Sequence, residues 1–158
     1  MTAFNLKQHP IRLTGAGKHD LRSQFGVVPY RVTDEGKTEI LVITARDNDR
    51  WILPKGWPMD GSTPAEAAAT EAFEEAGVEG QVAPMVLGLY SYRKAVNGDD
   101  LPIVVTMFAL RVDKVLKDWP EKRHRKRKWL SRKKAAALMK EPELAEIVRA
   151  FDPGALKH

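Results

Sequence analysis

The strongest constraint on the fold is a helix whose two ends are both marked in the sequence, between Thr63 and Gly77. Thr63 is followed by a proline and, three residues on, by Glu66, which is the spacing of a capping box at a helix N-terminus. Gly77 stands where a glycine in the left-handed conformation ends a helix. The sequence therefore predicts a helix over residues 64–76.

This helix is expected to have an apolar face and an acidic face. At about 100° per residue, five side chains fall on the arc that faces the core: Ala65, Ala69, Ala72, Phe73 and Ala76. Glu71, Glu74 and Glu75 fall on a separate arc, where like charges repel and where the helix dipole disfavours anions. A hard divalent cation such as Mg²⁺ would offset both effects because it prefers carboxylate oxygens. The alternative is a solvated acidic face.

Strands are expected on both sides of this helix. Runs rich in β-branched and aromatic residues at 26–33 and 39–45 flank a polar turn, which predicts a hairpin. Apolar runs at 82–92 and 101–112 flank Asn97-Gly98, the strongest short hairpin signal. The remaining expected elements are a short strand opening into a loop at 51–58, a helix from Ser131 through Met139, and a last helix carrying Leu144, Ile147, Val148 and Phe151.

Composition limits the chain to a globular domain without thiol chemistry. Its 158 residues, 43% of them hydrophobic, can bury one core. The absence of cysteine excludes disulfides and thiolate zinc sites. No apolar run reaches the ~20 residues of a membrane span, and no signal-peptide core is visible. We expect a cytoplasmic protein with no membrane partner, an N-terminal arm over residues 1–25 and a single domain over 26–158.

The net charge of +5 is concentrated in one segment. Residues 121–134 hold nine Lys and Arg against one acid, so the rest of the chain is mildly acidic. A concentrated basic segment favours contact with a polyanion. A solvated basic loop is the alternative.

The residues from Gly56 to Val78 resemble the Nudix box, G-x5-E-x7-R-E-U-x-E-E-x-G-U, in which U is a bulky aliphatic residue. Six positions match in register: Gly56, Glu71, Glu74, Glu75, Gly77 and Val78. Ser62, Thr70 and Ala72 replace the first Glu, the Arg and the first aliphatic residue of the pattern. In the family the Glu and Arg carry charges that brace the box. Here both are neutral, so no unpaired ion is left, and we expect a hydrogen-bonded or packed substitute for the brace.

The resemblance implies an α/β fold, the Nudix-type α/β/α sandwich with a mixed β-sheet, and hydrolysis of a diphosphate with Mg²⁺ or Mn²⁺. It implies Glu71, Glu74 and Glu75 as catalytic residues and, with the Gly56 carbonyl, as metal ligands; Glu71 is also a candidate base. Cations that bridge diphosphate oxygens neutralise charge as the phosphoryl group transfers and activate a water. Candidates for a further carboxylate outside the box are Asp99, Asp100 and Glu121.

Two weaker matches resemble the branch of the family that acts on diphosphoinositol polyphosphates and diadenosine polyphosphates. They are residues 53–56 and the pattern Trp119, Glu121, Arg125, Arg127 and Trp129. A substrate with many phosphates requires Arg and Lys donors, and the candidates for phosphate contacts are Lys55, Arg125, Arg46 and Arg93. Each of these is alternatively an ordinary surface cation.

Three other functions stay open at this point. The chain could be an RNA 5′-end pyrophosphohydrolase, with the basic segment holding the RNA, or another nucleoside-diphosphate hydrolase. A nucleic-acid-binding module without catalysis is the third reading, and its binding would weaken steeply with salt and need no divalent ion. The expected partner is thus a phosphate-rich small molecule or an RNA 5′ end, and the oligomeric state stays open.

Overall fold

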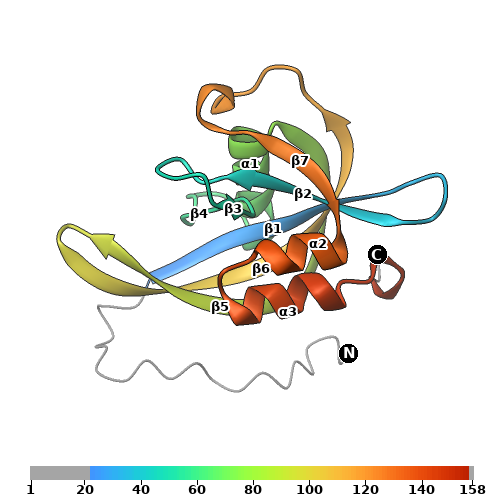
Figure 1. The fold of residues 1–158 in the computed structure, drawn as a ribbon. Coiled ribbons are helices and arrows are strands. Elements are labelled where there is room, and N and C mark those ends of the chain that lie inside the picture. The colour runs from blue at the N-terminus through green and yellow to red at the C-terminus, as the bar shows by residue number, and fades with distance from the viewer. Residues whose placement is uncertain (1–21, 157–158) are drawn as a thin grey trace.

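The computed structural model of the protein describes residues 22–156, which form a seven-stranded mixed sheet with helices on both faces (Figure 1). The strands are β1 (Arg22–Val32), β2 (Thr38–Thr44), β3 (Trp51–Ile52), β4 (Lys55–Gly56), β5 (Val78–Val96), β6 (Asp99–Val115) and β7 (Arg127–Ser131). Their order is β3-β2-β1-β6-β5, with β4 beside β1 and β7 beside β2. β1 and β6 run parallel, and the other pairs are antiparallel.

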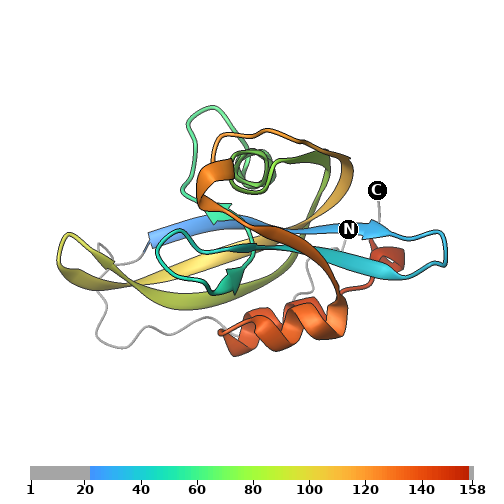
Figure 2. The ribbon, with the colours of Figure 1, turned by 45° about the horizontal axis from the view of Figure 1, so that its top comes forward.

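The helices cover the sheet in two layers. They are α1 (Pro64–Ala76), α2 (Arg132–Leu138) and α3 (Pro142–Ala150), with short 3-10 turns η1 (Lys122–His124) and η2 (Pro153–Ala155). Figure 2 shows α1 end-on above the sheet and α2 and α3 below it. This arrangement confirms the expected α/β/α sandwich with a mixed sheet. Within the described residues, no helix is long and apolar enough to cross a membrane.

Both expected hairpins are present, and β1, β5 and β6 are longer than the runs from which they were predicted. Asn97 and Gly98 connect β5 to β6 with φ angles of 51° and 84°, so both central residues of the turn are left-handed, as a two-residue hairpin turn requires. β1 begins at Arg22, which lies opposite Ile103 of β6. Residues 22–25 of the expected arm therefore belong to the sheet, and the arm's residues 1–21 lie outside the described residues.

The core lies in two layers, one on each face of the sheet. On one face, Tyr30 packs edge-to-face against Phe151 with ring centroids 4.9 Å apart, among buried residues of α2 and α3. On the other face, α1 contributes only alanines to the buried cluster: Ala65, Ala68, Ala72 and Ala76. The prediction that Phe73 faces this core was wrong, because the alanines set a close contact between helix and sheet and Phe73 stays 38% exposed beside it.

The basic segment is divided among several elements instead of forming one loop. Its residues make up η1, β7 and the start of α2. Arg125, Arg127 and Arg132 donate to the backbone carbonyls of distant residues. The exposed cations of the segment are Lys122, Arg123, Lys126, Lys128, Arg132, Lys133 and Lys134. Three arginines therefore hold the fold together, and the others are exposed to solvent.

Candidate active site

The helix that carries the three glutamates is fixed at its start by the predicted capping box. The Thr63 hydroxyl accepts from the Glu66 amide at 3.1 Å, and the Glu66 carboxylate accepts from the Thr63 amide at 2.8 Å. Gly77 ends the helix with a φ of 66°, in the left-handed region. Both marks read from the sequence are confirmed, and they fix the rotation of α1 and so the direction in which its glutamates point.

Glu71 and Glu75 form a carboxyl pair on α1 even though both are acids. The two side chains are close enough to interact directly, and each shifts the pKa of the other. Burial is the main cause that raises the pKa of Glu75 to about 8, and the interaction with Glu71 adds to it. Burial likewise raises the pKa of Glu71. Two cations act on Glu75: Arg125, whose guanidinium lies 3.7 Å from its carboxylate, and Lys55.

The strand β4, which precedes α1, is in direct contact with this pair. A Cβ placed on Gly56 would lie 2.1 Å from the Glu71 carboxyl carbon, far inside van der Waals contact, so only glycine permits the approach. The Lys55 amide donates to Glu75 at 3.4 Å. Gly56 and Glu71, both implied as ligands by the box, are therefore neighbours in space.

The residues around the pair fit a hard divalent cation. The negative charges of Glu74 and Glu121 both raise the pKa of Glu71, so four carboxyl groups act on one region. Oxygen donors of this kind suit Mg²⁺ or Mn²⁺. Among residues 22–156, no three acidic or histidine side chains lie together as a ready-made metal centre. The structure thus shows a close pair, Glu71 and Glu75, with Glu74 and Glu121 farther out.

Of the three carboxylates proposed from outside the box, the structure brings Glu121 toward the site. Asp100 pairs with Arg93 at 2.9 Å on the exposed β5–β6 hairpin, and Asp99 is exposed at the start of β6. Glu121 accepts from Arg125 at 2.9 Å and from Arg46 at 3.2 Å. Among these three, Glu121 is the carboxylate whose charge reaches Glu71.

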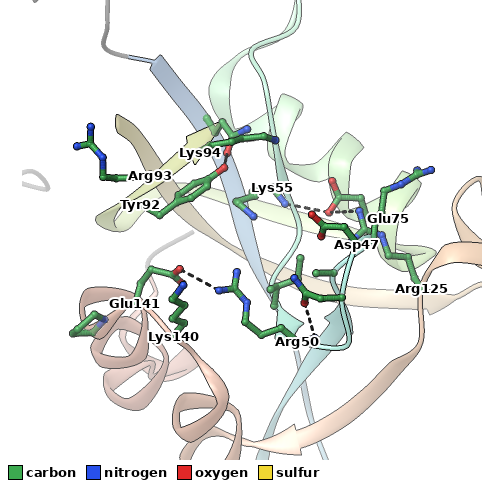
Figure 3. Close-up of a pocket in the computed structure, with 16 residues that line it drawn as sticks. Asp47, Arg50, Lys55, Glu75, Tyr92, Arg93, Lys94, Arg125, Lys140 and Glu141 are labelled. Atoms are coloured by element: carbon green, nitrogen blue, oxygen red, sulfur yellow. Dashed lines mark hydrogen bonds and ion pairs between the residues drawn. The ribbon is translucent and has the colours of Figure 1, made fainter. Parts of the chain in front are cut away.

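A groove of about 820 Å³ opens beside Glu75 (Figure 3). Its walls include all four cations proposed for phosphate contacts, Arg46, Lys55, Arg93 and Arg125. The sequence did not single out three further cations there: Arg50, Lys94 and Lys140. The acids on the walls are Asp47, Glu75 and Glu141, so seven basic side chains stand against three acidic ones.

The groove cations differ in how firmly they are held. The Arg125 side chain is only 7% exposed, and it donates to the Thr44 carbonyl at 2.9 Å as well as to Glu121. Burial lowers the pKa of Lys55, and its ammonium lies 5.1 Å from the centre of the Tyr92 ring. Arg93, by contrast, is on an exposed hairpin. The groove therefore has a rigid end near Glu75 and a solvated end near the hairpin.

Comparison with known proteins agrees with this fold. The model of the NUDIX domain matches residues 21–151. "Nudix hydrolase 12, mitochondrial" of Arabidopsis thaliana is 35% identical, over 84% of this chain and 73% of that protein. "Diphosphoinositol polyphosphate phosphohydrolase 2" of Rattus norvegicus is 34% identical, over 57% of this chain and 48% of that protein. A solved C. elegans Ap4A hydrolase complex shares the fold with a TM-score of 0.60 at 22% identity, over 81% of this chain and 93% of that chain.

The mixed sheet between two layers of helices, together with the match over residues 21–151, defines the class of the protein as a Nudix-type domain. This chain belongs to the NUDIX domain family and is a Nudix hydrolase.

Proposed function

We propose that this chain hydrolyses a diphosphate linkage in a phosphate-rich small molecule, a diphosphoinositol polyphosphate or a diadenosine polyphosphate, with Mg²⁺ or Mn²⁺ as cofactor. The observation that carries the proposal is the groove, in which seven Lys and Arg side chains lead to the buried carboxyl of Glu75. Arg and Lys donors match the many oxygens of a polyphosphate. The carboxylates at the end of the groove supply ligands for a divalent cation.

The box residues have two roles in this proposal, as ligands of the cation and as a base for the attacking water. Glu71, Glu74, Glu75 and the Gly56 carbonyl would hold the cation, which when bound neutralises charge on the diphosphate and lowers the pKa of a water. Glu71 is the candidate base that orients the attacking water. Glu121 is the candidate carboxylate from outside the box, because its charge reaches Glu71.

The groove cations bind and orient the phosphates. Arg125 and Lys55 lie at the rigid end beside Glu75, where they would fix the phosphates next to the bond that breaks. Arg46 and Arg93 would contact phosphates farther along the groove. Holding the reacting diphosphate in one orientation lowers the entropic part of the barrier.

The lining of the groove favours the inositol compounds over the dinucleotides. Among the described residues that line it, Tyr92 is the single aromatic side chain. Its ring already contacts Tyr90, and its hydroxyl donates to Gln24 at 2.6 Å. Adenine binding uses stacking on open aromatic faces, which this wall does not offer. The rat relative's name points to the same substrate class.

A second candidate, the RNA 5′-end pyrophosphohydrolase, draws on one further observation. A hollow of about 570 Å³ adjoins the groove and is lined by residues 44–49 and 122–126, including Arg46 and Arg125, which also line the groove. The exposed Lys122, Arg123 and Lys126 could hold a nucleic-acid backbone there.

Phosphate release from a substrate panel tests the proposal. The panel contains diphosphoinositol polyphosphates, diadenosine polyphosphates, sugar nucleotides and 5′-triphosphate RNA, each with and without Mg²⁺. We expect turnover of the inositol compounds that depends on Mg²⁺. In Glu75→Gln, turnover falls at least about 100-fold because a ligand carboxylate is lost, whereas the control Glu79→Gln, an exposed acid outside the groove, keeps its rate.

Turnover of RNA alone would favour the second candidate, and turnover of sugar nucleotides alone would overturn the substrate class. Equal rates for Glu75→Gln and the wild type would overturn the assigned site. The compartment stays a prediction: the sequence led us to expect the cytoplasm, and several relatives carry mitochondrial or chloroplastic names.

A further inference from the structure

The C-terminal end of α1 is held by hydrogen-bond donors that lie more than forty residues farther along the chain. The last four carbonyls of a helix have no partner within it, and in α1 these belong to residues 73–76, the turn that carries Glu74 and Glu75. The Gly77 amide donates to the first of them, the Phe73 carbonyl, at 3.1 Å. The remaining three are all satisfied from residues 119–127.

Each of the three remaining carbonyls has a separate donor. The Glu121 amide donates to the Glu74 carbonyl at 3.0 Å. The Trp119 indole Nε1 donates to the Glu75 carbonyl at 3.0 Å. The Arg127 guanidinium donates to the Ala76 carbonyl at 2.8 Å. Two of the three glutamates that the box implies as metal ligands, Glu74 and Glu75, therefore have their backbone carbonyls bound by this segment.

Trp119 and Arg127 also support each other. The Arg127 guanidinium lies 3.8 Å from the centre of the Trp119 ring, and it donates to the carbonyls of Gly77 and Leu116 as well. A Cβ on Gly77 would lie 2.6 Å from both side chains, so they pack directly on the end of the helix. Figure 2 shows the segment leading into β7 passing around α1.

Arg127 also supplies a charge that the helix lacks. The last turn of α1 holds no basic residue of its own, although a cation there interacts favourably with the helix dipole. The position that the family fills with arginine cannot do this, since Thr70 donates to the Glu66 carbonyl within the helix. Ser62, at the other position of the lost charge pair, is exposed.

From these contacts we infer that Trp119 and Arg127 are positioning residues that fix Glu74 and Glu75 for metal binding, and that they replace the internal charge pair of the box. The inference deepens the proposed function, because it rests on these glutamates as ligands. These contacts hold the C-terminal end of the helix, whereas positions 62 and 70 lie before the helix and within it. The contacts of Trp119 and Arg127 explain how the glutamates of α1 stay in position although Ser62 and Thr70 replace the charged Glu and Arg of the box.

The test uses two conservative variants and a matched control in the full chain. Trp119→Phe keeps a ring beside Arg127 and removes the indole N–H. Arg127→Lys keeps the charge and removes the fork that reaches several carbonyls at once. The control is Arg132→Lys, which alters an arginine that donates to the carbonyl of Phe151, on the face of the sheet opposite α1.

Two measurements separate this inference from the proposed function. The first is Mn²⁺ binding without substrate, followed by the electron paramagnetic resonance signal of the free ion. The second is hydrogen exchange of the amides of residues 73–77. In Trp119→Phe and Arg127→Lys, we expect Mn²⁺ to bind about tenfold more weakly and exchange of these amides to be faster. Arg132→Lys should match the wild type in both.

Faster exchange with unchanged Mn²⁺ affinity would overturn the positioning role, as would an equal loss of affinity in Arg132→Lys. If the wild type itself bound no Mn²⁺, the proposed function would fail, and exchange would still report whether Trp119 and Arg127 hold the helix. Unchanged exchange in both variants would show that they do not hold it.

Discussion

Gly56 and Glu71 lie so close together that a single added carbon at Gly56 would overlap the Glu71 carboxyl, with 2.1 Å to its central carbon. The two residues are fifteen positions apart in the sequence and belong to different elements, β4 and α1. Their contact joins the loop and the helix of the box at the point where the cation is proposed to bind.

Gly56→Ala should therefore displace the Glu71 carboxyl without unfolding the protein. A displacement of about 1 Å at a reacting group can reduce the rate about 100-fold, and we expect a loss of this order in kcat. The control is Gly154→Ala, because Gly154 has ordinary backbone angles and its added carbon would meet only the Asp152 side chain, at 3.3 Å. An unchanged rate in Gly56→Ala would show that the position of Glu71 does not matter for catalysis.

The capping box gives a prediction about stability. Thr63→Ala removes the acceptor for the Glu66 amide, and the loss of such a cap costs about 1 kcal/mol in the free energy of unfolding. Chemical denaturation followed by circular dichroism measures this value. Ser62→Ala is the control, since its exposed hydroxyl is not part of the cap, and we expect a change within about 0.5 kcal/mol. Equal effects of the two changes would contradict the capping role.

Ala72 tests how closely α1 approaches the sheet. The Nudix box has a bulky aliphatic residue at this position, but Ala72 is completely buried among other small and apolar residues. Ala72→Ile restores the family's pattern and yet should destabilise the fold by roughly 1–3 kcal/mol through overpacking. The same change at the exposed Ala137 of α2 controls for helix propensity. If Ala72→Ile raised the free energy of unfolding instead, α1 and the sheet would be too far apart at this position for overpacking.

Some parts of the fold can be predicted from the sequence because the residues that form them interact with near neighbours in the chain. The limits of α1 were predictable because Thr63, Glu66 and Gly77 act within a few residues of the helix ends. The hairpin turn at Asn97 and Gly98 was equally local. Phe73 was misplaced because periodicity alone cannot show that neighbouring alanines bring the helix close to the sheet.

The types of residue in the site could be predicted from the sequence, whereas the contacts between residues that are far apart in the chain could not. Resemblance and charge selected Arg46, Lys55, Arg93 and Arg125, and the structure places all four around one groove. Lys140 and Glu141 complete the groove from beside α3, at the wall away from Glu75 (Figure 3). No local pattern marks them, because their role depends on how distant elements pack. The bonds of Trp119 and Arg127 to α1 escaped prediction for the same reason.

Lys94 provides a test of the charge of the groove by itself. It lines the groove from the exposed hairpin, with its ammonium 5.7 Å from the centre of the Trp57 ring. Lys94→Ala should raise KM for a diphosphoinositol polyphosphate about fivefold, equivalent to ~1 kcal/mol for a solvated ionic contact. The value of kcat should stay within about twofold, because the contact is made equally in the ground and transition states.

The control is Lys114→Ala, which removes an exposed cation from the other end of the same hairpin and changes the net charge equally. Salt separates a local contact from the general field of the protein, since exposed charges farther apart than about 10 Å are screened at ~0.1 M. The difference in KM between the two variants should therefore persist at this ionic strength. Equal KM values for Lys94→Ala and Lys114→Ala would show that only net charge attracts the substrate, and would remove Lys94 from the binding groove.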